Sequence, residues 1–405
     1  MPHLPHSVGQ NLNNTFPSSE MLIAQRVNSQ KKIMDITAAT LSLLIMLIAI
    51  YILAIMTDEY FVPSLDYISH LLNLPHNVAG ASLMAVGSSA PELAIALTAL
   101  FQGNGEHSDV GIGTIVGSAV FNILVITGAS ALVRPAKITL SVVIRDCLFY
   151  VLSIGLLLIT FFDGKIYPLE AFSFLLVYVG YLIILYKWNA WFPEETGEVG
   201  TEEQPSSPLN GNSANSAKST EDKQRSILAT LNHWTAQMLG FFAGKVEQSY
   251  LRVFLVSIAV IVGLSWILVK SVIVFGDATN IPPVIVALTL LAAGTSAPDM
   301  ISSMIVARQG RGDMAVANAV GSNIFDILIG LGLPWLLAMG IGMMNGGSVF
   351  VEVGTADLLN STLVLLGTVF ILFIFLYTQR TLSRIEGGIL IALYIIYVLW
   401  IALGG

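Results

Sequence analysis

Apolar residues fill ten long stretches of this chain, and polar residues are confined mainly to the connections between them. A helix that crosses a membrane needs about 20 mostly apolar residues. The pattern therefore predicts an all-α, multi-pass membrane protein with about ten transmembrane helices. The expected spans cover residues 36–56, 76–102, 109–132, 141–162, 166–187, 249–275, 281–307, 313–343, 357–378 and 385–403.

One connection is much longer than the others and divides the chain into two halves. Within it, residues 193–225 contain no aromatic residue and are rich in Ser, Gly, Pro, Asn and Glu, a composition that predicts disorder. Apolar residues then recur at helical spacing, which predicts a short amphipathic helix that lies on the membrane interface or binds a regulatory partner. These residues are Ile227, Leu231, Trp234, Met238 and Phe241.

Lys and Arg residues indicate how the chain is oriented, because cytoplasmic loops carry an excess of them. If the first span runs inward, 13 of these residues lie in inside loops and 5 lie outside. The sequence therefore predicts that both ends of the chain are outside and that the long loop is cytoplasmic. Arg26, Lys31 and Lys32, just before the first span, favour the opposite orientation.

Composition narrows the function classes further. The chain is 55% hydrophobic and 11% charged, whereas soluble domains carry about 25% charged residues. This excludes a disordered protein, a typical cytosolic enzyme and a nucleic-acid binder with a basic face. The single cysteine, Cys147, can form neither an intrachain disulfide nor a metal cluster. We therefore expect no cofactor and no nucleic acid, and membrane lipid and transported ions as the partners.

The chain contains an internal repeat. Residues 80–93 and 287–300 are identical at 6 of 14 positions, and residues 108–128 and 312–332 at 8 of 21. The repeats begin in the second and the seventh expected span, and a separation of five spans gives the two copies opposite orientations. Inverted repeats with interrupted helices are typical of secondary transporters, with the substrate site near the midplane.

Three carboxylates lie well inside expected spans: Glu92, Asp299 and Asp326. A charge in the hydrocarbon region is costly, and no Lys or Arg lies near them in the same helices. Cations or protons must therefore balance them. Two similar hairpins that merely pack together would not explain why Glu92 matches Asp299 and Asn122 matches Asp326.

The residues around these acids predict broken helices lined with oxygen. Pro91 and Pro298 lack an N–H, so the carbonyls of Gly87 and Gly294 lose their helical partners. Such a break is tolerated in a membrane only where it faces a cavity. The donor set contains oxygen alone, which suits Ca²⁺ and Na⁺ rather than zinc or copper. Its hydroxyls are Ser88, Ser89, Ser118, Thr295, Ser296 and Ser322.

At these residues the sequence resembles the calcium/cation antiporter superfamily, and within it the potassium-dependent sodium/calcium exchanger family. The segments Gly87-Ser88-Ser89-Ala90-Pro91-Glu92 and Gly294-Thr295-Ser296-Ala297-Pro298-Asp299 are similar to its two α-repeats. The finer resemblance rests on residues 58–63, 111–122 and 321–326. It implies a polar tail over 1–35, exchanger membrane regions over 36–187 and 249–405, and a cytoplasmic loop over 188–248.

The resemblance also implies roles for the site residues. Glu92 and Asp299 would be the central Ca²⁺ ligands, and Ser88, Ser89, Thr295 and Ser296 would complete the Ca²⁺ and Na⁺ sites. Ser118, Asn122 and Ser322 would line outer Na⁺ positions, and the carbonyls of Ala85 and Ala292 would also serve. Asp326 is associated with potassium dependence, and three carboxylates would balance one Ca²⁺ and one K⁺.

The expected function is Na⁺-driven Ca²⁺ antiport with K⁺ moved together with Ca²⁺, through sliding of the first and sixth spans past the repeat core. A plasma membrane location is favoured over an internal membrane. The loop is too short for a calcium-sensing domain, and the extracellular cysteines of animal members are absent.

Three alternatives remain at the level of sequence. Protonatable acids also allow Ca²⁺/H⁺ exchange, and a calcium channel is a further reading that inverted repeats disfavour. Gly310-Arg311-Gly312-Asp313 matches a short pattern of intramembrane aspartyl proteases, but no paired aspartate motif precedes it. We expect Asp313 to act as a helix cap instead.

Overall fold

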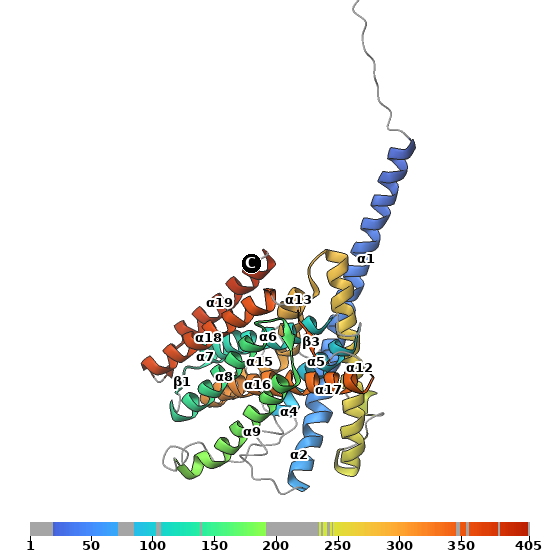
Figure 1. Ribbon diagram of the computed structural model, residues 1–405. Helices are drawn as coiled ribbons and strands as arrows, with labels where there is room; N and C mark the ends of the chain where they lie inside the picture. Colours follow the sequence, from blue (N-terminus) through green and yellow to red (C-terminus); the bar gives the residue numbers. More distant parts are fainter. Residues whose placement is uncertain are drawn as a thin grey trace, which may run out of the picture.

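The computed structural model is built almost entirely from helices (Figure 1). It describes residues 19–71, 85–102, 107–137, 140–191, 235, 238–240, 244, 246–345, 349–353, 356–379 and 381–403. The all-α, multi-pass membrane architecture that the apolar pattern predicts is confirmed.

The helices of the first half are α1 (Ser19–Met56), η1 (Thr57–Phe61), α2 (Val62–Leu71), α4 (Ala85–Ser88), α5 (Ala90–Phe101), α6 (Ser108–Phe121), η4 (Asn122–Ile126), α7 (Thr127–Val133), α8 (Leu140–Thr160) and α9 (Pro168–Trp191). Those of the second half are α12 (Val246–Thr279), α13 (Pro283–Val286), η5 (Ala287–Leu291), α14 (Ala292–Thr295), α15 (Ala297–Arg308), α16 (Gly312–Leu328), α17 (Gly332–Met344), α18 (Ala356–Gln379) and α19 (Arg384–Ala402).

Within the described residues, eight helical stretches are long and apolar enough to cross a membrane. A ninth, Pro283–Arg308, is bent by 43° between Thr295 and Ala297. The second expected span is represented by α4 and α5, and its first part lies outside the described residues. The number of ten spans therefore stays a prediction.

The first helix is longer than the sequence pattern suggests. It begins at Ser19, inside the predicted polar tail, and continues through the π-helical turn η1 into α2. Its apolar stretch runs over Gln30–Ile68. The predicted end of the first span at residue 56 is therefore wrong, and Asp58 lies within the helix rather than after it.

Two large hydrophobic clusters and one small one form the core of the described residues. In the first, α1, η1 and α2 pack along α12, with Leu53, Phe61 and Val269 fully or almost fully buried. In Figure 1 this pair of long helices lies side by side at the right edge. The second cluster joins the remaining spans and includes Trp335, which packs edge-on against Phe174. The first cluster also includes Ile95 of α5 and Leu291 of η5, so the α1–α12 pair packs directly against elements of both repeats.

Four two-residue strands link the two halves of the chain. β1 (Ala136–Lys137) pairs with β4 (Thr381–Leu382), and β2 (Lys165–Ile166) pairs with β3 (Val351–Glu352), both antiparallel. The spans α8 and α18 separate the two sheets, so these lie at opposite membrane faces. The strands β1 and β3 occupy equivalent places in the two repeats, and so do β2 and β4. The pairing of β1 with β4 is therefore equivalent to that of β3 with β2, as expected for inverted copies.

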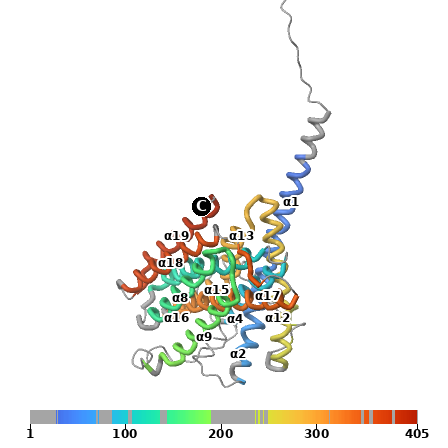
Figure 2. The backbone as a smooth tube through the Cα atoms, in the orientation of Figure 1, coloured from blue at the N-terminus to red at the C-terminus, as the bar shows by residue number. Residues whose placement is uncertain are grey.

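The ends of the helices that flank the long loop lie on one side of the molecule. Figure 2 shows the end of α9 and the start of α12 at the bottom, whereas the C-terminus lies toward the top. The helix ends that flank the long loop and the end of α19 thus lie on opposite sides (Figure 2), which agrees with the expected topology. Which side faces the cytoplasm stays a prediction.

A short part of the predicted amphipathic helix is described. Residues 238–240 are helical, and the hydroxyl of Thr235 lies 3.3 Å from that of Tyr51 on α1. Leu239 packs with the α1–α12 cluster, whereas Met238 of the predicted apolar stripe is exposed. This part of the loop therefore contacts the first helix. Ile227, Leu231, Trp234 and Phe241 lie outside the described residues.

Candidate cation site

Both predicted helix breaks are present, at matching residues of the two repeats. Ser89 separates α4 from α5 with φ −94° and ψ 5°, and Ser296 separates α14 from α15 with φ −86° and ψ −3°. A proline follows at the second position of each new helix. Because proline has no N–H, it fits the first turn of a helix and disrupts the preceding one.

The glycines before the breaks also have a packing role that the sequence does not show. Gly87 and Gly294 lie inside α4 and α14. A Cβ on Gly87 would lie 2.8 Å from Val62 Cγ2, and one on Gly294 would lie 2.5 Å from Ile50 Cδ1. Both glycines therefore let the α1–α2 helix approach the broken segments closely.

The two main acids occupy equivalent places. Glu92 and Asp299 are the third residues of α5 and α15. Backbone N–H groups at a helix N-terminus carry partial positive charge, which stabilises a nearby carboxylate. Within the described residues, no Lys or Arg forms an ion pair with either acid or with Asp326. The helix ends therefore supply only part of the compensating charge.

Side-chain contacts at the site join one repeat to the other. The hydroxyls of Ser118 and Ser296 lie 2.8 Å apart. The Asn122 amide nitrogen donates to Ser322 Oγ at 3.4 Å. Two further contacts bring a hydroxyl of one repeat to an acid of the other: Thr295 to Glu92, and Ser89 to Asp326. The predicted residues thus meet at the interface of the repeats.

Three buried oxygen atoms at this interface have no hydrogen-bond partner: Glu92 Oε2, Asn122 Oδ1 and Asp326 Oδ1. Their residues are 3%, 1% and 2% exposed. An unpartnered buried oxygen is costly, and three of them together indicate a missing electropositive ligand. Hard cations prefer such oxygen donors. Across the described part of the chain, no three His, Cys, Asp or Glu residues form a metal cluster, so hydroxyl and amide oxygens must contribute.

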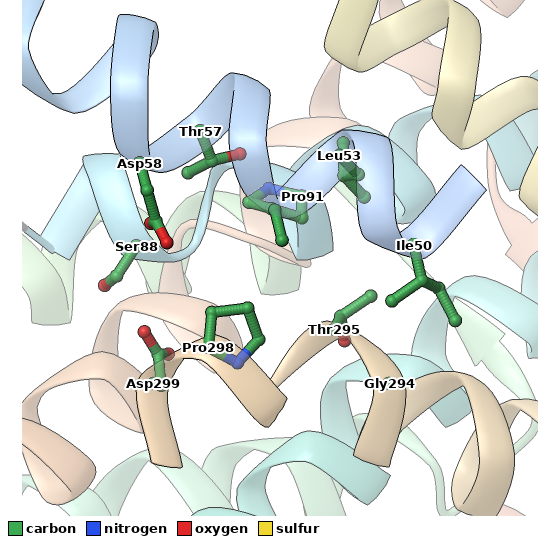
Figure 3. Close-up of a pocket in the computed structure, with 11 residues that line it drawn as sticks. Ile50, Leu53, Thr57, Asp58, Ser88, Pro91, Gly294, Thr295, Pro298 and Asp299 are labelled. Carbon is green, nitrogen blue, oxygen red and sulfur yellow. The ribbon is translucent and has the colours of Figure 1, made fainter. Parts of the chain in front are cut away.

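A small cavity of about 20 Å³ opens beside the two breaks. One wall is formed by α1 and η1, including Ile50, Leu53 and Thr57, and the opposite wall by α14 and α15. Figure 3 shows the side chains of Asp58, Ser88 and Asp299 close to one another at one end. Asp299 therefore faces the cavity, whereas Glu92 and Asp326 lie deeper in the protein.

Asp58 and Thr57 are not among the ligands that the sequence predicts. Asp58 is exposed and lines the cavity, and the buried Thr57 Oγ1 has no partner. The sequence contained a signal, because Asp58 lies only two residues beyond Met56, the end of a long apolar run. The spacing rule ended the span at residue 56 and placed this acid in a loop.

The remaining predicted ligands are backbone carbonyls. Ala85 and Ala292 begin the short helices α4 and α14, at matching positions. The carbonyl of Ala292 accepts the Ser296 N–H at 3.1 Å and the Thr295 hydroxyl at 3.2 Å. In this conformation both lone pairs of that oxygen are engaged, so a bound cation would have to displace a donor.

Asp313 is not at the N-cap position of its helix. Arg311 occupies the N-cap of α16, and Asp313 is the second residue of the helix. The predicted cap position is therefore wrong by two residues.

Both halves of the chain match one known family. The model of the family described as sodium/calcium exchanger protein matches residues 42–187 and 249–403. This chain belongs to that family. Human sodium/potassium/calcium exchanger 5 is 33% identical to it, over 92% of this chain and 84% of the relative. Human sodium/potassium/calcium exchanger 4 is 29% identical, over 89% of this chain and 80% of the relative.

Two solved exchangers share the fold. The crystal structure of the H⁺/Ca²⁺ exchanger CAX matches with a TM-score of 0.59 at 13% identity, covering 90% of this chain and 82% of that one. The sodium-calcium exchanger NCX_Mj matches with a TM-score of 0.50 at 21% identity, covering 89% and 97%. At these identities the likeness concerns the fold alone.

Proposed function

We propose that this family member is a secondary active antiporter that exchanges Na⁺ for Ca²⁺ by alternating access, with K⁺ transported together with Ca²⁺. The observation that carries the proposal is the meeting of Glu92, Asp299 and Asp326 at the repeat interface without a basic partner. The names of its relatives, which describe sodium/potassium/calcium exchangers, support the same ions.

Each ion is assigned to a part of the site by donor chemistry and by the family resemblance. We assign Ca²⁺ to Glu92 and Asp299, and the hydroxyls of Ser88, Ser89, Thr295 and Ser296 complete the Ca²⁺ and Na⁺ sites. Ser118, Asn122 and Ser322 line outer Na⁺ positions, and the carbonyls of Ala85 and Ala292 also serve as ligands. Asp326 carries the third negative charge, which balances K⁺ beside Ca²⁺. These assignments follow from oxygen donors that suit hard cations.

Alternating access requires a wall of the site that can move. The helices α1 and α12 pack along each other, and α1 with η1 forms one wall of the cavity. Contact across Gly87 and Gly294 is with the side-chain tips of Val62 and Ile50 rather than with backbone. Such a surface supports sliding of the pair past the broken helices, which would open the site to either side.

An enzymatic function finds no support. The relatives are exchangers, and the weak protease pattern at residues 310–313 lies at the start of α16 with no role at the cation site. We also propose the plasma membrane as the location, because the family resemblance favours it over an internal membrane.

The deciding experiment is Ca²⁺ uptake into proteoliposomes loaded with Na⁺, with and without external K⁺, at clamped pH and voltage. Uptake that needs both the outward Na⁺ gradient and K⁺ is expected. Uptake with Na⁺ but without a K⁺ requirement would remove K⁺ from the proposal. Uptake that ignores Na⁺ and follows an imposed pH gradient would make the protein a Ca²⁺/H⁺ exchanger instead.

A further inference from the structure

Asn323, on α16 next to Ser322, lies outside the predicted ligand set and yet is fully buried. Its side chain contacts three other helical segments through Asn122 of η4, Ala119 of α6 and Tyr150 of α8. We propose that Asn323 is a positioning residue that fixes the direction of the Asn122 amide, so that the Asn122 oxygen is presented to a transported cation. The inference rests on the proposed function, because it takes Asn122 as a ligand.

The direction of the Asn323 amide is set by a backbone group. Its Nδ2 donates to the carbonyl of Ala119 at 3.2 Å and to the Tyr150 hydroxyl at 2.9 Å. A carbonyl oxygen can only accept, so the NH₂ end of Asn323 must face Ala119. The Oδ1 end is thereby turned toward Asn122.

Asn122 must then donate in return. Its Nδ2 gives one hydrogen to Asn323 Oδ1 at 2.8 Å and one to Ser322 Oγ at 3.4 Å. Both amide hydrogens are used, and Asn122 Oδ1 has no partner although the residue is 1% exposed. An amide oxygen is a good ligand for a hard cation, and here it is held in place before the ion arrives.

The two repeats carry different residues at the positions of Asn122 and Asn323. Asn122 matches Asp326, and Asn323 matches Ala119. The two oxygens of an aspartate are equivalent, so Asp326 needs no residue to choose between its ends. An asparagine has two unlike ends and does need one. The second repeat supplies it in Asn323, whereas the first repeat has alanine at the matching position.

The test compares variants in the proteoliposome assay, with half-saturating Na⁺ and Ca²⁺ concentrations measured separately. Asn323→Leu keeps a similar volume but loses all three hydrogen bonds. We expect it to raise the half-saturating Na⁺ concentration by about three- to tenfold, as for a lost hydrogen bond. The half-saturating Ca²⁺ concentration should change by less than about twofold, because Asn122 is assigned to Na⁺.

Variants of the residues that contact Asn323 test whether its effect on Na⁺ acts through Asn122. Asn122→Ala should shift Na⁺ by a similar factor, and the double variant should be no worse than Asn122→Ala alone. Tyr150→Phe removes one contact but leaves the Ala119 contact, so its effect should be smaller than that of Asn323→Leu. Thr362→Val is the matched control, since this buried hydroxyl donates only within α18, to the Leu358 carbonyl.

Several outcomes would overturn the inference. Equal shifts for Na⁺ and Ca²⁺ would mean a general structural role, and additive effects in the double variant would mean that Asn323 acts independently of Asn122. An unchanged Na⁺ response in Asn122→Ala would mean that its oxygen is no ligand.

If Asn323→Leu does not fold, Asn323→Ala takes its place, because alanine is the residue at the matching position of the first repeat. Absence of Na⁺-coupled uptake in the wild type would instead refute the proposed function.

Discussion

Glu92 and Asp299 are alike in position but differ in exposure. Glu92 is 3% exposed and lies behind the wall of the cavity, whereas Asp299 is half-buried and lines it. An ion that reaches Asp299 from the cavity has still to pass toward Glu92 and Asp326. The site is therefore asymmetric in this conformation, although the sequence repeats that build it are matched.

Neutralising the deep acid tests the charge argument directly. Glu92→Gln keeps the size of the side chain but removes the negative charge that opposes Ca²⁺. We expect Ca²⁺ uptake to fall to background while the protein still folds, because the unpaired buried charge is costly to the free protein. The exposed Asp163→Asn is the control and should leave uptake unchanged. Retained uptake in Glu92→Gln would contradict the assignment.

Asp58 allows a graded test at the mouth of the cavity. Asp58→Asn should weaken the apparent affinity for Ca²⁺ by about two- to fivefold, because an exposed carboxylate attracts cations through screened charge. The effect should shrink when ionic strength is raised with a salt that is not transported. Glu59→Gln, next to it on η1 and exposed but not lining the cavity, should have little effect. Equal effects of both changes would argue against a specific role for Asp58.

At the level of elements, α6 packs on the second repeat through two glycines one helical turn apart. A Cβ on Gly113 would lie 3.2 Å from the Val284 carbonyl oxygen, and one on Gly117 would lie 2.3 Å from that of Leu288. Small residues at this spacing let membrane helices approach closely. The contact brings Ser118, the next residue along the chain, to Ser296. Close packing and site geometry thus depend on the same two positions.

This contact predicts a strong effect on stability. Gly117→Ala should lower the free energy of unfolding by about 1–3 kcal/mol, as overpacking against backbone does. Gly340→Ala, where a Cβ would meet nothing within 4 Å, should be neutral or stabilise by up to about 1 kcal/mol. Thermal unfolding in detergent compares the two variants. A similar melting temperature for both would show that α6 can move away from η5 at little cost.

At the scale of the whole molecule, the two small sheets connect the two repeats, one sheet at each membrane face. β1 pairs with β4 and β2 with β3, so each sheet takes one strand from each repeat. The candidate cation site lies at the interface of the repeats. Within the described residues, the α1–α12 pair contributes no strand to either sheet and contacts the core through side-chain packing with α5 and η5.

The two sheets also provide a test of orientation. Glu352→Cys and Arg384→Cys place thiols at exposed positions beside opposite sheets. With both chain ends outside, a membrane-impermeant maleimide added to intact cells should label Glu352→Cys and not Arg384→Cys. Permeabilised cells should allow labelling of both, and the buried native Cys147 should give little background. The reverse pattern would place the long loop outside.

The sequence by itself determined the elements and most of the candidate site. Apolar length is a local property, so the membrane spans follow from it, and the repeat predicted matched acids and a broken helix in each copy. The features that the sequence did not predict depend on contacts between segments that are distant in the chain. The run of α1 through Asp58, the close approach at Gly87 and Gly294, and the pairing of strands all arise when helices far apart in the chain pack together.

The direction of the Asn122 amide shows most clearly what the sequence alone does not determine. The sequence identifies Asn122 as a candidate ligand, but the direction of its oxygen depends on Asn323 and on the carbonyl of Ala119. Hydrogen-bond donors and acceptors choose partners in space, and these partners come from different repeats. The sequence therefore determined which atoms could bind a cation, whereas the tertiary structure decided which of them are left without another partner.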